Sequence, residues 1–223
     1  MKTVTKWIVA LLFPMFISLT ACAEGYKQGQ DFVELSNPQP TSSGDKIEVV
    51  ELFWYGCPHC HNLEPYLEKW LESKPEDVEF VRMPAILSSR WELLAKAYYT
   101  AELLGIVDKT HVALFEAIHK ENRKITDEAA VQDFFVSQGV SASDFKNTFN
   151  SFAVNVKINH ARQMSRRYAI SGVPNLIVNG KYSTTQSMAR GSEGVIRVVN
   201  YLIEQERTLS TNTVEPDVTA ASQ

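Results

Sequence analysis

The chain has 223 residues, which is enough for one domain of ordinary size, or for one domain that carries a large insertion. Two independent domains are not required. With 22 basic and 26 acidic residues the formal net charge is −4, and no stripe of Lys or Arg marks a phosphate-binding surface. The composition therefore argues against a nucleic-acid-binding protein.

An export signal is predicted at residues 1–23. Two lysines precede an apolar run at 7–19, and small residues around Cys22 are typical of a signal-peptidase cleavage site. The apolar run is shorter than the ~20 residues that span a membrane, so we expect cleavage after Ala23. Residues 19–22 also resemble a lipoprotein box, in which case Cys22 would carry a lipid anchor. Either way Cys22 does not remain a free thiol in the oxidising compartment outside the cytoplasm.

The next part of the chain has the pattern of a βαβ unit. Residues 47–54 are rich in β-branched and aromatic side chains, which predicts a largely buried strand. Apolar residues at helical spacing predict a helix at 57–74, with Pro58 in the first turn, where a proline costs no hydrogen bond. Another strand is expected at 78–83, so the unit should be a right-handed parallel crossover. A shorter strand is expected earlier, at 32–35.

The middle of the chain, residues 88–168, is predicted to be helical throughout. Apolar residues recur there at helical spacing, and no strand pattern interrupts them. Gly105 and Gly139 are expected to end helices. The expected helix starts are Asp108, Thr126 and Ser143.

Strand signals return after this helical segment. A strand is predicted at 175–178, Asn179-Gly180 is typical of a two-residue hairpin turn, and a last helix should begin near Ser192. The final residues are rich in Thr and Ser without an apolar period, which predicts disorder. The expected organisation is a signal peptide at 1–23, one α/β domain in two parts at 24–87 and 169–207, a helical insertion at 88–168 and a disordered tail at 208–223.

Cys57 and Cys60 form a Cys-x-x-Cys motif at the junction of a predicted strand and helix. Cys57 should lie at the helix N-terminus, where backbone N–H groups and the helix dipole favour the thiolate that attacks disulfides. Cys60 is one turn further on, placed to resolve a mixed disulfide. His59 can add a positive charge or a hydrogen bond to the Cys57 sulfur. With Pro58, these residues form the predicted catalytic motif of a redox-active dithiol.

Chemistry argues against three other interpretations of the Cys-x-x-Cys motif. A structural disulfide between Cys57 and Cys60 would close a very short loop and constrain little of the unfolded chain. A zinc site usually needs a second pair of ligands, and His59 and His61 alone do not supply one. His61 also completes Cys-x-x-Cys-His, the attachment signature of c-type haem. The buried strand directly before the motif argues against haem, so no metal and no cofactor are expected.

A second candidate feature is Gly172-Val173-Pro174, directly before the strand predicted at 175–178. Proline is allowed at the first position of a strand, and an X-Pro bond can be cis. Because the segment follows a Cys-x-x-Cys unit and precedes a hairpin, we expect a cis-proline packed beside the dithiol. Val173 would then offer its backbone to a substrate strand. Substrate is expected to bind near Val173 and Pro174 through backbone hydrogen bonds and apolar contacts.

Together, the segment 53–60, the helical insertion and Gly172-Val173-Pro174 followed by the segment 178–182 resemble the DsbA family of bacterial periplasmic thiol:disulfide interchange proteins. The resemblance covers about residues 32–206. It implies an α/β protein whose thioredoxin fold is interrupted by an inserted all-helical domain. It also implies a periplasmic protein that oxidises unfolded exported proteins and is reoxidised by a DsbB-like membrane oxidase. We expect the protein to be a monomer.

The same resemblance points to three charged residues that tune the dithiol. Glu64, four residues after Cys60, matches the acidic residue that the family carries under the active-site helix. Glu51 and Arg82 match its buried strand charges, although family members often have a lysine at the position of Arg82. Ordinary surface charges or a salt bridge would explain the same three residues without a catalytic role.

Other functions on the same fold stay open at this point. A thiol reductant would use the same cysteine pair at a less oxidising potential. An isomerase usually adds a dimerisation domain, for which the sequence offers no candidate segment. A peptide-binding lipoprotein would keep the groove and tolerate the loss of both thiols.

Overall fold

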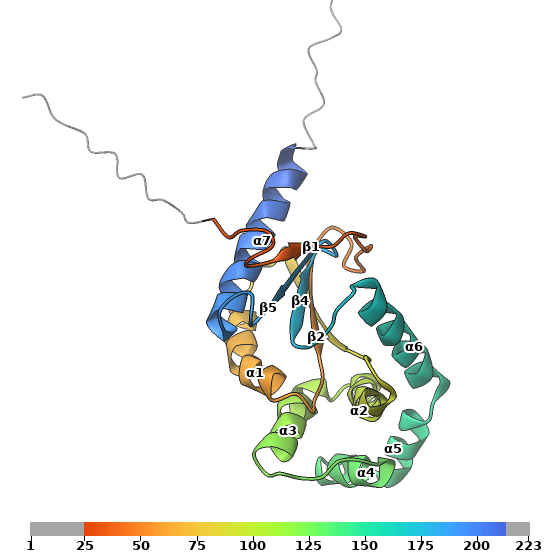
Figure 1. The fold of residues 1–223 in the computed structure, drawn as a ribbon. Helices are drawn as coiled ribbons and strands as arrows, with labels where there is room; N and C mark the ends of the chain where they lie inside the picture. The colour runs from red at the N-terminus through yellow and green to blue at the C-terminus, as the bar shows by residue number, and fades with distance from the viewer. Residues whose placement is uncertain (1–24, 213–223) are drawn as a thin grey trace, which may run out of the picture.

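The computed structural model describes residues 25–212, which form a mixed five-stranded sheet covered by helices (Figure 1). The strands are β1 (Val33–Glu34), β2 (Ile47–Phe53), β3 (Val78–Pro84), β4 (Asn175–Val178) and β5 (Tyr182–Thr185), in the order β1-β5-β4-β2-β3. β2 pairs in parallel with β3 and antiparallel with β4, and β5 is antiparallel to β4 and β1. The predicted parallel crossover between β2 and β3 is therefore present.

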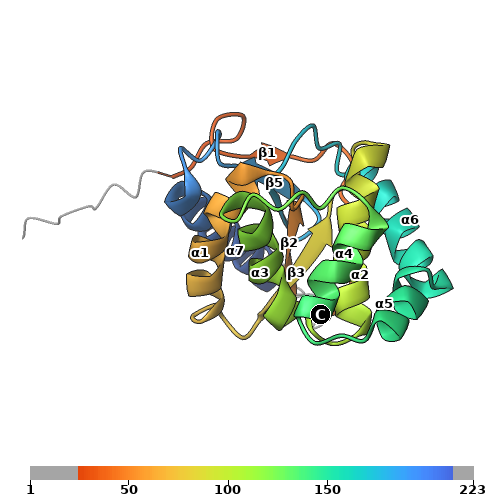
Figure 2. The ribbon, with the colours of Figure 1, turned by 90° about the horizontal axis from the view of Figure 1, so that it is seen from below.

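The helices form two groups, those that lie between β3 and β4 in the sequence and those that lie outside this stretch (Figures 1 and 2). They are α1 (Pro58–Leu71), the short 3₁₀ helix η1 (Ser89–Trp91), α2 (Glu92–Leu103), α3 (Val107–His119), α4 (Glu128–Ser137), α5 (Ala142–Phe149), α6 (Phe152–Arg167) and α7 (Ser192–Asn212). α1 and α7 cover one face. The helices α2 to α6 lie between β3 and β4 in the sequence, with α2 in contact with each of the other four. The predicted α/β fold with an all-helical insertion is confirmed.

Strand β2 is buried on both faces along its whole length, so it lies in the interior of the fold. Side chains alternate along a strand, so its residues feed two separate cores. Ile47 and Val49 pack in the cluster under α1 and α7, whereas Val50 and Leu52 belong to the cluster shared with the helical insertion. Glu51 lies on the same buried strand, and its side chain has no exposed surface.

Several turn predictions are confirmed, and the helix starts need correction. Gly105 and Gly139 follow helix ends with φ of 68° and 88°, a backbone region that glycine enters without strain. The N-caps, however, are Ile106, Asp127 and Ser141, not the three positions expected. The Asp127 and Ser141 side chains each accept a hydrogen bond from a backbone N–H three residues on, which the expected residues do not do.

The two ends of the described chain also differ in part from expectation. β1 has only two residues, since pairing with β5 is limited to Val33 and Glu34. α7 continues to Asn212, so residues 208–212 are helical and not part of a disordered tail. Thr208 and Ser210 donate side-chain hydrogen bonds to carbonyls one turn back, which suits a helix despite the lack of an apolar period. Residues 1–24 and 213–223, with the predicted signal peptide and Cys22, lie outside the described residues.

None of the helices within residues 25–212 is both long and apolar enough to cross a membrane.

Candidate active site

Cys57 lies where β2 gives way to α1. β2 ends at Phe53, and the backbone N–H of Cys57 donates to the Trp54 carbonyl at 2.9 Å, which closes a tight turn. Glycine at position 56 leaves room for the Trp54 ring, since a Cβ atom there would lie 2.4 Å from it and the ring would have to move. Cys57 is the N-cap of α1 and Pro58 its first residue, as predicted. The free backbone N–H groups of a helix start therefore surround the Cys57 sulfur.

The two cysteines are free thiols in this structure and differ in exposure. Cys57 keeps 8% of its surface exposed, whereas Cys60 in the first turn of α1 keeps none. An approaching thiol can therefore reach only the Cys57 sulfur. This assigns the attacked position to Cys57 and the resolving position to Cys60.

Hydrogen bonds lower the pKa of Cys57 from 9.0 to about 6. The largest contribution is a hydrogen bond from the Cys60 thiol, and burial opposes it. The backbone N–H groups of Cys60 and His59 also bond to the sulfur, and the charge of His59 acts in the same direction. In contrast, burial and then the neighbouring Cys57 sulfur raise the pKa of Cys60 far above its usual range. At neutral pH the pair is one thiolate and one thiol.

The Val173-Pro174 peptide bond is cis, and it lies beside the dithiol. The Cys57 sulfur is 3.4 Å from the Val173 carbonyl oxygen, although 116 positions separate the two residues in the sequence. β4 begins at the next residue, Asn175, and pairs with β2, so the sheet itself brings this segment to the start of α1. The cysteine motif and the cis-proline segment, the two parts of the predicted site, therefore lie side by side.

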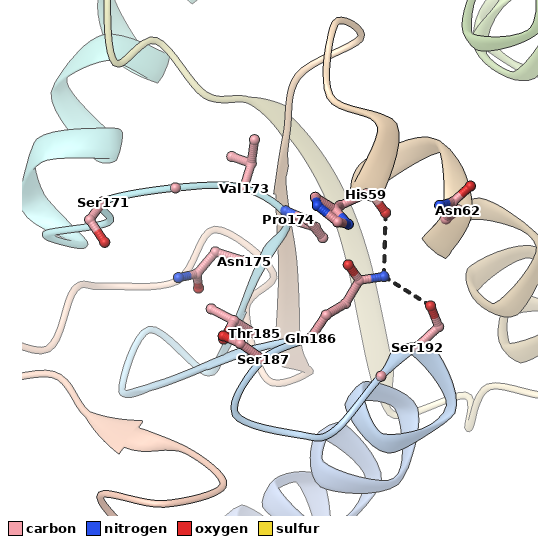
Figure 3. Close-up of a pocket in the computed structure, with 12 residues that line it drawn as sticks. His59, Asn62, Ser171, Val173, Pro174, Asn175, Thr185, Gln186, Ser187 and Ser192 are labelled. Atoms are coloured by element: carbon pink, nitrogen blue, oxygen red, sulfur yellow. Dashed lines mark hydrogen bonds between the residues drawn. The ribbon is translucent and has the colours of Figure 1, made fainter. Parts of the chain in front are cut away.

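A pocket of about 580 Å³ opens next to this contact (Figure 3). Val173 and Pro174 form its apolar part. Its other side chains are mainly polar: Asn62, Ser171, Asn175, Thr185, Gln186 and Ser192. Apolar contacts to substrate were expected here, and the structure limits them to two residues because the end of β5 and the start of α7 contribute polar side chains.

The three charged residues singled out from the sequence form a buried cluster beneath α1. Arg82 lies opposite Glu51 in the pairing of β2 with β3, and its Nε atom is 3.5 Å from Glu51 Oε2. A terminal nitrogen of Arg82 lies 3.0 Å from Glu64 Oε2, and Arg82 also reaches the exposed Glu68 at 2.6 Å. Burial, followed by the charge of Glu64, raises the pKa of Glu51 well above its usual range.

His111 of α3 completes this cluster and was not predicted. Burial alone would raise the pKa of Glu64, but the hydrogen bond from His111 and the charge of Arg82 outweigh it, so the pKa is lowered. An ionised carboxylate only accepts, so His111 Nε2–H donates to Glu64 Oε1 at 3.0 Å. Burial lowers the pKa of His111, and its neutral ring accepts from the Tyr55 hydroxyl at 2.9 Å. The only signal in the sequence was its position at helical spacing from Leu114 and Phe115.

α3 holds the active-site segment at a second point that the sequence did not reveal. His119 Nε2–H donates to the Tyr55 carbonyl at 2.8 Å. The His119 ring also stacks on His61, with ring centroids 5.1 Å apart and planes 10° from parallel. On the other side of the motif, Trp54 stacks on Trp91 at 4.6 Å. The helical insertion therefore supports the residues before and after the two cysteines.

The alternatives of a metal site and haem attachment can be tested against the residues present. Within residues 25–212, Glu51, Glu64 and His111 are the group whose ligand atoms lie within 4.8 Å of one another. Arg82 pairs with both carboxylates, 3.5 Å from Glu51 and 3.0 Å from Glu64, so a cation of the chain itself already balances them, which suits an ion pair and not a metal ion. Haem attachment would need both cysteine sulfurs at the surface, whereas Cys60 is fully enclosed.

Comparisons with known proteins agree with this geometry. The family model described as DSBA-like thioredoxin domain matches residues 76–202. The thiol:disulfide interchange protein DsbA of Pseudomonas aeruginosa is 42% identical over 197 residues, covering 88% of this chain and 93% of that protein. The protein of the same name from Azotobacter vinelandii is 41% identical, covering 82% of this chain and 85% of the relative.

Solved structures give the same result. The crystal structure of Pseudomonas aeruginosa DsbA superposes with a TM-score of 0.81 at 42% identity, covering 85% of this chain and 98% of that one. Oxidoreductase DsbA from Xylella fastidiosa has a TM-score of 0.77 at 33% identity, with coverage of 82% and 98%. These neighbours share the fold on which Cys57, Cys60 and the cis-proline meet. The chain therefore belongs to the DsbA family and is a thiol:disulfide oxidoreductase with a thioredoxin fold.

Proposed function

We propose that this oxidoreductase works as an oxidase, which introduces disulfide bonds into exported proteins through a Cys57–Cys60 disulfide. The observation that carries the proposal is the lowered pKa of Cys57, about 6, at the N-terminus of α1. Hydrogen bonds to the thiolate stabilise the reduced pair, and a pair that is stable when reduced readily takes electrons from other thiols.

The exchange proceeds in two steps. A substrate thiolate attacks the Cys57 sulfur, the bond between Cys57 and Cys60 breaks, and Cys60 leaves with the electron pair. A second substrate thiolate then attacks the substrate sulfur of the mixed disulfide, and Cys57 leaves as a thiolate. Two electrons pass from the substrate dithiol to the enzyme, and the substrate gains one disulfide.

The exposure of the two sulfurs sets this order of events, because only the Cys57 sulfur can be attacked. Cys60 leaves first and takes up a proton, because its burial disfavours a thiolate. Cys57 leaves second and stays ionised, because hydrogen bonds stabilise its thiolate. Glu51 adds to the raised pKa of Cys60, so Glu51, and through it Arg82 and Glu64, would tune the exchange without contact with substrate.

Unfolded exported proteins are the proposed substrates, and they would bind beside the cis-proline. Val173 offers a backbone carbonyl next to the Cys57 sulfur, so an extended substrate strand could hydrogen-bond there. The partner that reoxidises the enzyme would be a DsbB-like membrane oxidase. We propose a periplasmic monomer with residues 1–23 as its export signal, or with Cys22 as a lipid anchor.

The equilibrium of the Cys57/Cys60 pair with glutathione tests the direction of electron flow. We expect a reduction potential well above the value of about −270 mV for thioredoxin. A potential near that of thioredoxin would make the chain a reductant. In a second assay, Cys57→Ala should abolish disulfide formation in a reduced, unfolded protein, and unchanged oxidation by this variant would exclude catalysis by the pair.

A further inference from the structure

Several polar groups that line the pocket beside Cys57 make no hydrogen bond with another described residue. Asn62 and Ser171 line it without a side-chain hydrogen bond to any residue between 25 and 212. The Asn175 side chain is buried and accepts from Ser183 at 2.9 Å through Oδ1, while its amide nitrogen donates to no described residue. Donors and acceptors are thus left available to a ligand.

Gln186 is the central side chain of this pocket. Its Nε2 atom donates to the His59 carbonyl at 3.3 Å and to the Ser192 hydroxyl at 2.9 Å. These bonds hold the amide between the active-site turn and the start of α7. Figure 3 shows the amide oxygen on the Pro174 side of the side chain, and it accepts no hydrogen bond from a residue between 25 and 212. A fixed, unused acceptor therefore faces the place where substrate would lie.

The charge of the lining restricts the ligand further. Apart from His59, no side chain of the pocket is ionisable. A basic substrate side chain would lose water there without gaining a counter-charge, and an acidic one, although His59 is close, cannot donate to the amide oxygen of Gln186. A large apolar side chain would cover the Gln186 amide oxygen and the Asn175 amide nitrogen, which have no other partner among the described residues, at a cost of about 1–3 kcal/mol for each group so buried. A neutral polar side chain avoids both penalties.

We propose that this pocket selects substrates in which a neutral polar residue, such as Asn, Gln, Ser or Thr, stands next to the reactive cysteine. Gln186 is the specificity-determining residue: its amide oxygen accepts a hydrogen bond from that side chain while its nitrogen stays bound to His59. The inference rests on the proposed oxidase function and names the class of substrate that reacts fastest.

Three dithiol peptides that differ only in the residue beside the first cysteine, Asn, Leu or Asp, test the proposal. The oxidised full chain is mixed with each peptide, the reaction is quenched with acid, and the disulfide product is measured by mass spectrometry. We expect the Asn peptide to be oxidised at least about fivefold faster than the other two. Equal rates, or a faster Leu peptide, would overturn the inference and leave the oxidase function intact.

Two variants locate the preference. Gln186→Leu should reduce the Asn-to-Leu rate ratio to about one or reverse it, because the amide acceptor is lost and apolar surface replaces it. Gln205→Leu makes the same substitution on the exposed side of α7, outside the pocket, and should keep the wild-type ratio. An unchanged ratio in Gln186→Leu would refute its role. Failure of the wild type to oxidise any peptide would instead overturn the proposed oxidase function together with this inference.

Discussion

Cys57 and Cys60 are the same amino acid three positions apart, yet their pKa values shift in opposite directions. The difference comes from geometry. Cys57 caps the helix and receives hydrogen bonds, whereas Cys60 sits inside the first turn without exposed surface. One sulfur is therefore a good leaving group and the other a buried thiol, which is the asymmetry that disulfide exchange needs.

The hydrogen bond from Cys60 has a direct consequence for Cys57. It is the largest of the effects that lower the pKa of Cys57 to about 6. In Cys60→Ala we expect the pKa of Cys57 to rise, because the remaining backbone hydrogen bonds stabilise the thiolate less. Thiolate absorbance at 240 nm, followed against pH, measures this. An unshifted midpoint in Cys60→Ala would mean that the helix N-terminus alone stabilises the thiolate.

The Arg82 guanidinium balances the charge of two buried carboxylates. It pairs with Glu51 and Glu64, whose side chains are 0% and 3% exposed. Arg82→Leu should lower the free energy of unfolding by about 3–5 kcal/mol, because removing one partner leaves uncompensated buried charge. Urea unfolding measures the loss. Lys46→Leu is the control, since its pair with Glu79 is half-exposed and contributes less than about 1 kcal/mol. Equal effects of the two variants would contradict a buried role for Arg82.

At the scale of elements, the β4–β5 hairpin carries the cis-proline segment at one end and a tight turn at the other. Asn179 and Gly180 have φ of 50° and 64°, as the Asn-Gly pair predicts. A Cβ atom on Gly180 would lie 2.0 Å from the Gln39 carbonyl oxygen. The turn therefore needs glycine both for its backbone conformation and for the close approach of another segment.

Gly180 and Gly44 allow these two requirements to be separated. Both have φ of 64°, but a Cβ atom on Gly44 would meet nothing within 4 Å. Gly44→Ala should cost about 1 kcal/mol, from backbone strain alone. Gly180→Ala should cost at least about 2 kcal/mol more, because backbone must also move. Urea unfolding of both variants gives the comparison, and equal losses would show that the turn shifts freely away from Gln39.

α3 belongs to the helical insertion, yet it supports the active-site turn by contacts with Tyr55. Its first half presents His111 to the Tyr55 hydroxyl, and its last residue, His119, bonds to the Tyr55 carbonyl. Phe115, between them, packs on the Tyr55 ring with centroids 4.8 Å apart. The insertion thus holds the residue two positions before Cys57 from three sides.

At the scale of the whole molecule, the redox state of the pair is linked to folding. The thiolate of Cys57 is favoured in the folded reduced protein, with a pKa of about 6, against 9.0 for an ordinary thiol. A lowered pKa adds stability that is complete above the unfolded value and is lost as pH falls through the folded value. The oxidised protein has no such thiolate.

The stability of the reduced form relative to the oxidised form should therefore depend on pH. We expect the difference in free energy of unfolding to grow in favour of the reduced form from about pH 6 to about pH 9, and to flatten below pH 6. Urea unfolding of both forms across this range measures it. Histidines and carboxylates titrate in both forms and largely cancel in the difference. A pH-independent difference would contradict the lowered pKa of Cys57.

The sequence by itself determined those features that depend on neighbouring residues. The burial of β2, the position of Cys57 and Pro58 at a helix start and the Asn179-Gly180 turn all follow from local side-chain pattern and backbone preference. The helix starts were less predictable, because Asp127 and Thr126 can both cap a helix, and only the path of the chain selects between them.

The tertiary structure decided the contacts between distant segments. It placed Val173 beside Cys57, His111 against Glu64, and Gln186 against the His59 carbonyl, across 116, 47 and 127 positions respectively. Such contacts depend on the order of strands in the sheet and on how the insertion packs against it, which no local pattern encodes. The cysteine motif and its chemistry were therefore visible in the sequence, whereas the buried histidine and the polar substrate pocket emerged only when the sheet brought their residues together.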